Sequence, residues 1–342
     1  MRRSFFFLEI SYNNLMNSKE QLDADLLIIG AGPAGLTAAQ YGARANLKVL
    51  VIEQMACGGQ VLSIDVPENF PGNIERKDAA GKVIAAARTG FDLSQDMHSQ
   101  AEFFGAVFHS GTVSSLAKET GVFTAVLAAG GTKKASAVIA ATGAAHRKLG
   151  VSGEKEFAGM GVSYCATCDG PFFKNKKIFV VGGGDAACDE ARYLSRLASQ
   201  VIVVHRRDRF RAQKALAKRV MNDPNIEVRF NTVVKEIKGE QKVSSIVLER
   251  EGETYEEAAD AVFIFAGTIP QSSLAAGLKA ELDESGYIVT DQQMASSVPG
   301  LFAAGDVRSG TFRQIVVAAG EGASAARSAA EYIDELRGTA YR

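Results

Sequence analysis

The chain has 342 residues, of which 46% are apolar and 23% charged, and its formal net charge is −1. This length allows two domains with separate cores, and this composition excludes a disordered chain. The near-zero charge gives no indication of a nucleic-acid partner, and no apolar run reaches the roughly 20 residues that cross a bilayer. We therefore expect a cytoplasmic protein that has neither nucleic acid nor a membrane as a partner.

Residues 1–22 come before the first predicted strand. The apolar run at 5–8 resembles part of a secretion signal, but Glu9 interrupts it and no small-residue cleavage site follows. Met16 offers an alternative start of the chain. We treat 1–22 as an N-terminal extension and assign it no function.

One motif occurs twice in the chain. Residues 26–35 and 178–187 each run from an apolar strand through a glycine-rich turn into a helix, and the two copies align without a gap. A second apolar strand follows each copy. This unit is typical of dinucleotide binding, because the glycines let a pyrophosphate approach the turn and the helix N-terminus supplies amide donors. The predicted pyrophosphate-binding residues are Gly30, Gly32, Pro33, Ala34 and Gly35 in the first copy and Gly182, Gly184 and Asp185 in the second.

The two copies differ at the residue that ends the second strand. Glu53 ends it in the first copy, and a carboxylate there accepts hydrogen bonds from ribose hydroxyls but repels a 2′-phosphate. His205 ends it in the second copy and is followed by Arg206, Arg207 and Arg211. Guanidinium groups bind a 2′-phosphate through charge-assisted, forked hydrogen bonds. The first copy therefore suits FAD or NAD, and the second suits NADPH.

The four cysteines divide into one pair and two single residues. Cys165 and Cys168 form a CxxC motif, and in a reducing compartment this spacing indicates metal binding or redox chemistry. Zinc needs a second ligand pair, for which the sequence offers no suitable spacing. We therefore expect redox chemistry and no metal site. Cys57 and Cys188 are interpreted as small apolar packing residues.

The order of the predicted elements indicates that one domain is inserted into another. After the first copy come a helix near 78–104, several hairpin-like strands and the apolar run 137–143. The chain ends with a short strand at 300–306 and a helix at about 313–336. Neither can fold alone, so we expect both to return to the first domain. The predicted fold class is α/β, with two Rossmann-like dinucleotide-binding domains, the second inserted into the first.

The predicted domain limits follow from this order. The first domain consists of 23–147 and 269–342, and the second, which carries the CxxC motif, consists of 148–268. Two connections then join the domains, near 144–149 and 268–271. A double connection suits a hinge rotation better than free movement.

Several motifs, taken together, are similar to one family. From about residue 23 to the C-terminus the sequence resembles the low-molecular-weight, NADPH-dependent thioredoxin reductases, which are class II pyridine nucleotide-disulfide oxidoreductases. The matching segments are Gly30–Gly35, Glu53, Gly58–Gln60, Glu68–Gly72, Ala141–Gly143, Tyr164–Gly170, Gly182–Asp185, His205–Asp208, Gly305–Arg308 and Arg313–Gln314.

The resemblance implies a homodimeric flavoprotein with FAD in the discontinuous domain and NADPH in the inserted one. It also implies a relay in which hydride passes from NADPH to FAD, the electrons pass to the Cys165–Cys168 disulfide, and thiol–disulfide exchange follows with thioredoxin. A domain rotation would separate the two half-reactions. The resemblance assigns further FAD contacts to Gly59, Gln60, Asn69, Thr142, Gly143, Gly305, Asp306, Arg313 and Gln314.

Asp169 follows the second cysteine directly. We interpret it as the acid/base of the exchange reaction, although a helix-capping role is an alternative. Cys168, beside Asp169, is our choice for the cysteine on the flavin side. Two alternatives to the predicted function stay open. One is the same relay with a different dithiol acceptor protein, and the other is an FAD-binding redox sensor without turnover.

Overall fold

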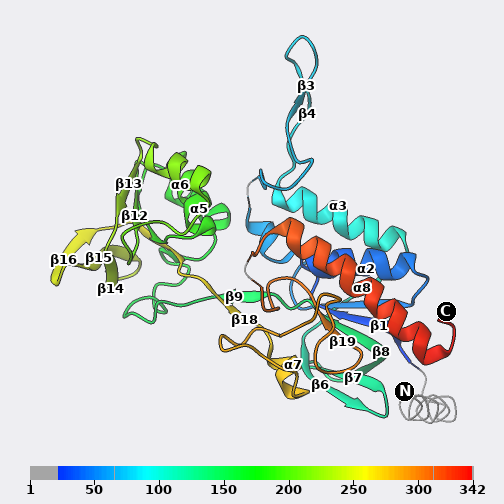
Figure 1. Ribbon diagram of the computed structural model, residues 1–342. Coiled ribbons are helices and arrows are strands. Elements are labelled where there is room, and N and C mark those ends of the chain that lie inside the picture. The colour runs from blue at the N-terminus through cyan, green and yellow to red at the C-terminus, as the bar shows by residue number, and fades with distance from the viewer. Residues whose placement is uncertain (1–21, 65, 311, 341–342) are drawn as a thin grey trace. The chain divides into compact units, whose positions relative to one another are not determined.

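The computed structural model describes residues 22–64, 66–310 and 312–340 (Figure 1). The chain forms two compact units. The first is built from two segments, one up to Ala144 and one from Pro270 onward, and the second is Ala145–Ile269. All but the last residue of the expected N-terminal extension, 1–22, lies outside the described residues. Within the described ranges, no helix has both the length and the apolar character to cross a membrane.

The first unit contains a seven-stranded sheet in the order β5-β2-β1-β8-β7-β6, with β19 also paired to β8. The parallel strands form a Rossmann-like core, and β6 and β7 add an antiparallel edge. The strands are β1 (Ala24–Ile29), β2 (Val49–Glu53), β5 (Val107–Ser110), β6 (Val113–Glu119), β7 (Val122–Leu127), β8 (Thr132–Ala140) and β19 (Leu301–Ala303).

Strand β1 is apolar from Leu26 to Ile29, as expected for a strand with both faces of its sheet covered. Leu26 and Ile28 point into one apolar cluster and Leu27 and Ile29 into another, as the alternation of side chains along a strand requires. The helices and turns of this unit are α2 (Pro33–Arg44), the 3₁₀ turn η1 (Gly59–Ser63), α3 (Gly90–Phe103), α7 (Ser273–Gly277) and α8 (Ile315–Arg337). The late elements β19 and α8 thus return to the first unit, as the sequence predicts.

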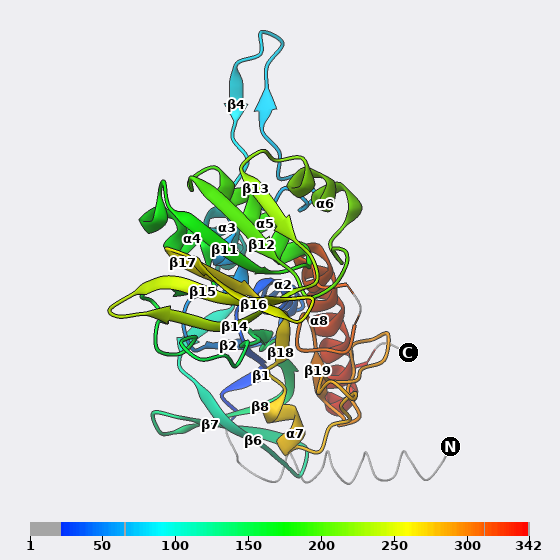
Figure 2. The same ribbon diagram turned by 90° about the vertical axis from the view of Figure 1, so that its left-hand side faces the viewer.

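The expected helix near 78–104 is shorter than predicted. Strands β3 (Arg76–Lys77) and β4 (Val83–Ala85) form a hairpin, which projects at the top of Figure 2. Asp78 fixes its turn, because its carboxylate accepts the N–H groups of Ala80 and Lys82 at 2.9 and 3.0 Å. Helix α3 begins only after Thr89, which forms a capping box with Asp92.

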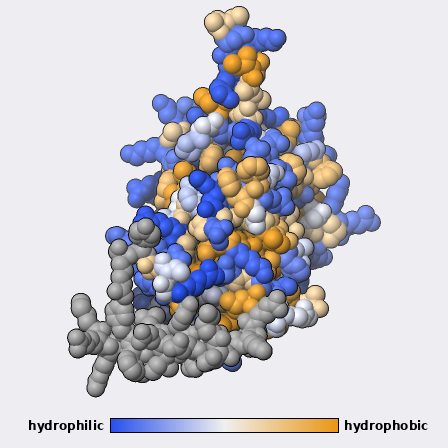
Figure 3. Space-filling view, turned by 90° about the vertical axis from the view of Figure 1, so that its right-hand side faces the viewer, coloured by the Kyte–Doolittle hydropathy of each residue, from blue (hydrophilic) through white to orange (hydrophobic). Residues whose placement is uncertain are grey.

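The surface of the hairpin mixes charged and apolar side chains. Val83 and Ile84 are 44% and 64% exposed, and the projection at the top of Figure 3 shows hydrophobic and hydrophilic residues together. A two-stranded hairpin alone is marginally stable in water.

The second unit contains a five-stranded parallel sheet in the order β10-β17-β11-β12-β13 and a three-stranded antiparallel sheet β14-β15-β16. This is the second Rossmann-like fold. Its elements are β10 (Val162–Ser163), α4 (Ala166–Asp169), η2 (Gly170–Phe173), β11 (Lys177–Gly182), α5 (Asp185–Ser195), β12 (Gln200–Val204), α6 (Lys214–Met221), β13 (Ile226–Arg229), β14 (Thr232–Gly239), β15 (Val243–Arg250), β16 (Glu253–Ala258) and β17 (Ala261–Phe265).

The chain passes between the units through two short strands, β9 (Ala144–His146) and β18 (Thr268–Pro270). These strands pair with each other. The N–H of Arg147 donates to the Gly267 carbonyl at 2.8 Å, and the N–H of Gln271 donates to the Gly143 carbonyl at 2.9 Å. The two connections are therefore joined by hydrogen bonds.

Candidate functional site

The first glycine-rich turn is too tightly packed for side chains at two positions. A Cβ added to Gly30, whose φ is +101°, would lie 2.3 Å from the Ala141 carbonyl oxygen, and one added to Gly35 would lie 1.9 Å from the Gly30 oxygen. Gly32 differs, because nothing lies within 4 Å of its Cβ position. It is the N-cap of α2 and has no capping side chain. The turn is thus packed on the protein side and open on the other, which fits a pyrophosphate at the N-terminus of α2, where Pro33 and Ala34 lie.

A second loop meets this turn. Gly59 has a φ of +57°, and a Cβ placed on it would lie 3.2 Å from the Gly32 Cα atom. The N–H of Gly58 donates to the Ala31 carbonyl at 2.7 Å, and Gln60 donates through Nε2 to the Ala144 carbonyl at 3.0 Å. The structure therefore brings the Gly58–Gln60 motif beside the first glycine turn, as expected for two parts of one site.

Glu53 ends β2 beside the same turn. Its two oxygens accept the N–H groups of Ala31 and Met55 at 2.7 and 2.9 Å. A carboxylate has about four lone-pair sites, so acceptors remain for ribose hydroxyls. The carboxylate also holds the turn in place, a role that nothing in the sequence pattern indicates.

Asp306 and Arg313 lie at the end of the last strand and before α8. Burial raises the pKa of Asp306, and the positive charge of Arg313 opposes this shift. The guanidinium of Arg313 lies 4.1 Å from the centre of the Tyr287 ring, and its Nε atom is buried without a hydrogen-bond partner in the described part of the chain. An unpaired buried donor needs an acceptor. This donor therefore fits a bound group such as the isoalloxazine or ribityl part of FAD.

The remaining predicted FAD contacts lie in the same unit. Asn69 donates through Nδ2 to the Gln314 Oε1 atom at 2.7 Å, which joins two motifs far apart in the sequence. Thr142 donates through Oγ1 to the Gln271 carbonyl at 2.7 Å, beside Gly143 with its φ of +65°. Both Asn69 and Thr142 thus already have protein partners. A Glu321 oxygen accepts the N–H of Gly305 at 2.8 Å, so α8 fixes the turn that carries Asp306.

Cys165 and Cys168 form a disulfide. Cys165 is the N-cap of the short helix α4, and its Sγ atom accepts the N–H of Cys168 at 3.1 Å. Cys168 is exposed and Cys165 is half-buried. Asp169 is the last residue of α4, and its N–H donates to the Cys165 carbonyl at 3.2 Å. Asp169 thus lies in the same helical turn as Cys165 and Cys168.

The second glycine-rich turn repeats the features of the first. A Cβ added to Gly182 would lie 2.4 Å from the Phe265 carbonyl oxygen, whereas nothing lies within 4 Å of the Cβ position of Gly184, the N-cap of α5. Asp185 accepts the backbone N–H and the side-chain amide of Gln213 at 2.7 and 3.0 Å. This carboxylate therefore fixes the segment that follows the arginine cluster.

The ring of His205 lies under the second glycine turn. It is 8% exposed, and a Cβ added to Gly183 would lie 2.4 Å from its Cε1 atom. Burial, followed by the charges of Arg207 and Arg206, lowers the pKa of His205. The structure thus places a neutral ring that supports the turn at a position where the sequence predicts a contact with the cofactor.

The guanidinium-bearing residues of this site are exposed. Arg206, Arg207 and Arg211 all have exposed side chains, and the N–H of Arg211 donates to the Gly183 carbonyl at 2.7 Å. That bond ties the arginine cluster to the glycine turn. Three exposed cations beside an open helix N-terminus fit a nucleotide that carries a 2′-phosphate.

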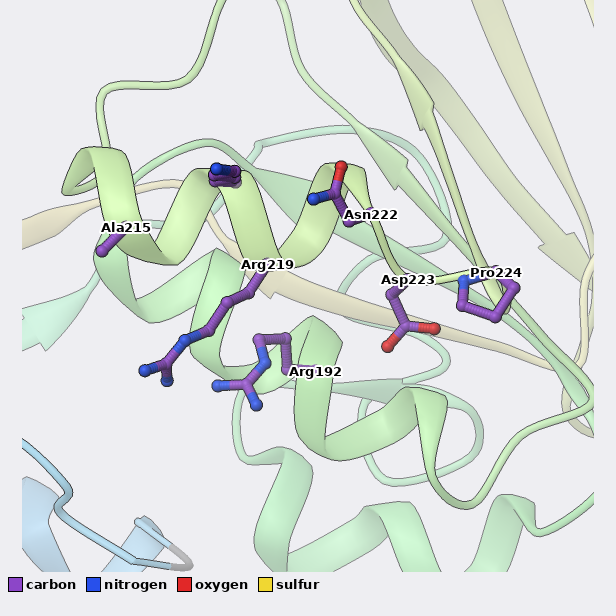
Figure 4. A pocket seen from close by; sticks show the side chains of 7 residues that line it. Arg192, Ala215, Arg219, Asn222, Asp223 and Pro224 are labelled. Atoms are coloured by element: carbon purple, nitrogen blue, oxygen red, sulfur yellow. The ribbon is translucent and has the colours of Figure 1, made fainter.

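A groove of about 600 Å³ lies at the carboxyl ends of α5 and α6 (Figure 4). Arg192, Lys218 and Arg219 stand in the last turns of these helices, where cations stabilise the helix dipole. The groove contains none of the predicted site residues. Its lining residues are Arg192, Ala215, Lys218, Arg219, Asn222, Asp223 and Pro224. Among the described residues, no group of three or more His, Cys, Asp and Glu could hold a metal ion.

Comparisons with known proteins identify the family. The pyridine nucleotide-disulphide oxidoreductase family matches residues 24–322. A thioredoxin reductase from Treponema pallidum is 51% identical over 319 residues, which are 93% of this chain and 99% of that protein. One from Listeria innocua is 45% identical over 329 residues, or 94% of this chain and 97% of that protein.

Solved structures give the same result. The crystal structure of Lactococcus lactis thioredoxin reductase matches with a TM-score of 0.85 and 39% identity, covering 92% of this chain and 100% of that one. The T. acidophilum thioredoxin reductase matches with a TM-score of 0.83 and 34% identity, covering 91% and 98%. The predicted fold of two Rossmann-like units and the predicted family are confirmed. The chain therefore belongs to the pyridine nucleotide-disulphide oxidoreductases and, within them, to the thioredoxin reductases.

Proposed function

We propose that this chain reduces the disulfide of thioredoxin with electrons from NADPH, through FAD and the Cys165–Cys168 pair. One observation carries the proposal: the disulfide closes at the start of α4, in a unit that also has an open glycine turn and an exposed arginine cluster. FAD and NADPH are the cofactors of this family. When bound, FAD accepts a hydride and passes on two electrons.

The first unit offers a complete set of groups for FAD. In the proposal the glycine turn and the N-terminus of α2 hold the pyrophosphate, Glu53 accepts hydrogen bonds from the ribose, and Asp306 accepts one from the ribityl chain. Arg313 and Gln314, at the positive end of α8, would face the pyrimidine edge of a bound flavin, where positive charge would favour the reduced, anionic form. The second unit holds NADPH through the turn at Gly182–Gly184 and the arginine cluster.

The cysteine pair carries the electrons to the protein substrate. Two electrons and two protons convert the disulfide into two thiols. One cysteine, as the thiolate, attacks a sulfur of oxidised thioredoxin, and the second resolves the mixed disulfide, so that thioredoxin leaves as a dithiol and the pair is oxidised again. We assign proton transfer to Asp169 and the flavin-side position to Cys168.

The organisation of the molecule forms part of the proposal. We assign FAD to the domain made of 23–147 and 269–342 and NADPH to the domain 148–268, with a rotation about the two connections between the half-reactions. We also assign a homodimer and a cytoplasmic location. Sedimentation of the flavin-loaded protein at micromolar concentration tests the dimer, and a monomer under these conditions would contradict it.

The first test is anaerobic oxidation of NADPH by the purified yellow protein with a thioredoxin. We expect turnover with NADPH, much weaker turnover with NADH, and loss of thioredoxin reduction in Cys168→Ser. A stable mixed disulfide with thioredoxin, formed by Cys168→Ser but not by Cys165→Ser, would agree with Cys168 as the flavin-side residue. Flavin bleaching without thioredoxin reduction would move the proposal to another acceptor protein, and no bleaching by NADPH would refute the electron donor.

A further inference from the structure

Glu154 is a buried carboxylate in the second unit, 4% exposed, that no step of the proposed relay uses. One of its oxygens accepts the N–H of Gly150 at 2.6 Å. The other accepts the N–H of Leu149 at 2.9 Å and the hydroxyl of Tyr164 at 2.7 Å. A single carboxylate thus binds the segment that follows β9 and the residue that precedes Cys165.

The segment around Glu154 is itself fixed to the core of the unit. The N–H of Ile237, on β14, donates to the Ser152 carbonyl at 2.9 Å. Gly153 lies so close to the same strand that a Cβ on it would be 1.9 Å from the Ile237 carbonyl oxygen. Phe157 is 3% exposed. The backbone next to Glu154 is therefore held against β14.

The ring of Tyr164 adds contacts to the same connection. The Lys148 Nζ atom lies 3.3 Å from the centre of the ring, within the range of a cation–π interaction. The His146 ring stacks on it at a centroid distance of 6.0 Å and an interplanar angle of 26°. His146 ends β9, so side chains of the first connection contact the residue next to the disulfide directly. The backbone of the connection is linked to that residue through Glu154.

The protonation states of Glu154 and Tyr164 strengthen the hydrogen bond between them. Burial alone would raise the pKa of Glu154, but the hydrogen bonds from Tyr164, Leu149 and Gly150, together with the charge of Lys148, lower it instead. Burial, followed by the bond to Glu154, raises the pKa of Tyr164. At neutral pH the carboxylate is therefore ionised and the phenol protonated, which makes this a charge-assisted hydrogen bond.

We propose that Glu154 and Tyr164 are positioning residues of the redox reaction, which hold the first connection, residues 146–150, and the dithiol at 165–168 together as one rigid element. This inference rests on the proposed function, since it concerns the delivery of electrons to that dithiol. If the connection turns during the cycle, the dithiol turns with it in a fixed orientation. A free connection would let the dithiol reorient separately, and electron transfer to it would lose preorganisation.

The test compares the flavin-loaded protein with Tyr164→Phe, Glu154→Gln and the double variant. Tyr255→Phe is the matched control, because Tyr255 packs against the same apolar cluster as Tyr164. Anaerobic stopped flow measures flavin bleaching by NADPH, and rapid quenching with an alkylating reagent measures the appearance of the two thiols. Hydrogen exchange of the Leu149 and Gly150 amides measures the contact itself without reference to activity.

In each single variant we expect the bleaching rate and the KM for NADPH to stay within ~2-fold of wild type. Thiol formation should slow by ~10-fold, because the variant loses or weakens a hydrogen bond to a charged group. The double variant should be no slower than the slower single one, because both changes act on the same Tyr164–Glu154 hydrogen bond. The amides of Leu149 and Gly150 should exchange faster in Glu154→Gln. If that variant does not fold, Tyr164→Phe still decides the matter.

Thiol formation at the wild-type rate in Tyr164→Phe, or an equal slowing in Tyr255→Phe, would overturn the inference. So would additive losses in the double variant. Failure of NADPH to bleach the wild-type flavin is a different result, since it would refute the proposed function and with it the redox role of this pair.

Discussion

Replacing Gly322 by alanine should weaken the packing of α8 on α2. Gly322 is buried, and a Cβ added there would lie 2.1 Å from the Ala34 carbonyl oxygen. Cβ atoms essentially never come within 3.0 Å of another atom, so one helix must move by nearly 1 Å. The atom that is struck belongs to the backbone of a helix and cannot rotate away. We therefore expect a packing penalty toward the upper end of the ~1–3 kcal/mol of overpacked cores.

Gly320 supplies the control for this substitution. It lies in the same helix, is exposed, and has nothing within 4 Å of its Cβ position. Each alanine gains ~0.5–1 kcal/mol of helix propensity, so the difference between the two variants isolates the contact with Ala34. Gly320→Ala should be stabilised by that amount, and Gly322→Ala destabilised by ~1–2 kcal/mol.

Denaturant unfolding, followed by circular dichroism and by flavin release, measures the two free energies. In a thermal melt each kcal/mol corresponds to a shift of ~2–4 °C in a unit of this size. Ala34 stands in the first turn of α2, so Gly322→Ala should also lose FAD more readily on dilution. Unfolding free energies that differ by less than ~0.5 kcal/mol between the variants would refute the reasoning, because a clash with backbone cannot be that small.

Three further predictions concern the site and its electrostatics. Cys168→Ser should retain flavin bleaching by NADPH but reduce thioredoxin at below ~1% of the wild-type rate, because exchange needs both sulfurs, and full activity in a coupled assay would contradict the relay. Changing Arg206 and Arg207 to alanine should raise the KM for NADPH by at least ~10-fold and leave that for NADH unchanged, and equal effects on both would remove the 2′-phosphate assignment. The hydrogen bond from Arg229 lowers the pKa of Glu257. The ion pair therefore stabilises the fold above the unfolded-state pKa of Glu257, and this stabilisation is lost as the pH falls through the lower folded-state pKa. In Glu257→Gln the free energy of unfolding should consequently fall less steeply with decreasing pH in the acid range. An unchanged slope would contradict this prediction.

The sequence predicts the strands and glycine turns well because their causes are local. The apolar runs of β1 and β11 leave few alternatives to a buried parallel strand. The helix expected near 78–104 shows the limit of such reasoning. Its first half is rich in helix-forming alanine, but the Asp78 side chain binds backbone N–H groups two and four residues ahead and forms a turn instead.

The parts of the site that the sequence did not reveal depend on contacts across the fold. Nothing in the pattern around Glu53 indicates that it also binds the Ala31 amide. The position of His205 after β12 predicts a contact with the cofactor. The packing of its ring beneath Gly183 is a further relation, which only the folded turn creates. The bond between Asn69 and Gln314 likewise joins residues 245 positions apart.

The discontinuous first unit has a consequence for the synthesis of the chain. Strand β8 gains its partner β19, and α2 gains its cover α8, only after the whole of Ala145–Ile269 has left the ribosome. Domains generally fold as units during translation, so the inserted unit can fold first. The apolar surface of the incomplete sheet stays exposed until the C-terminal segment has been synthesised. A nascent chain stalled before residue 301 should therefore be the species that chaperones bind, and its capture should end once α8 has emerged.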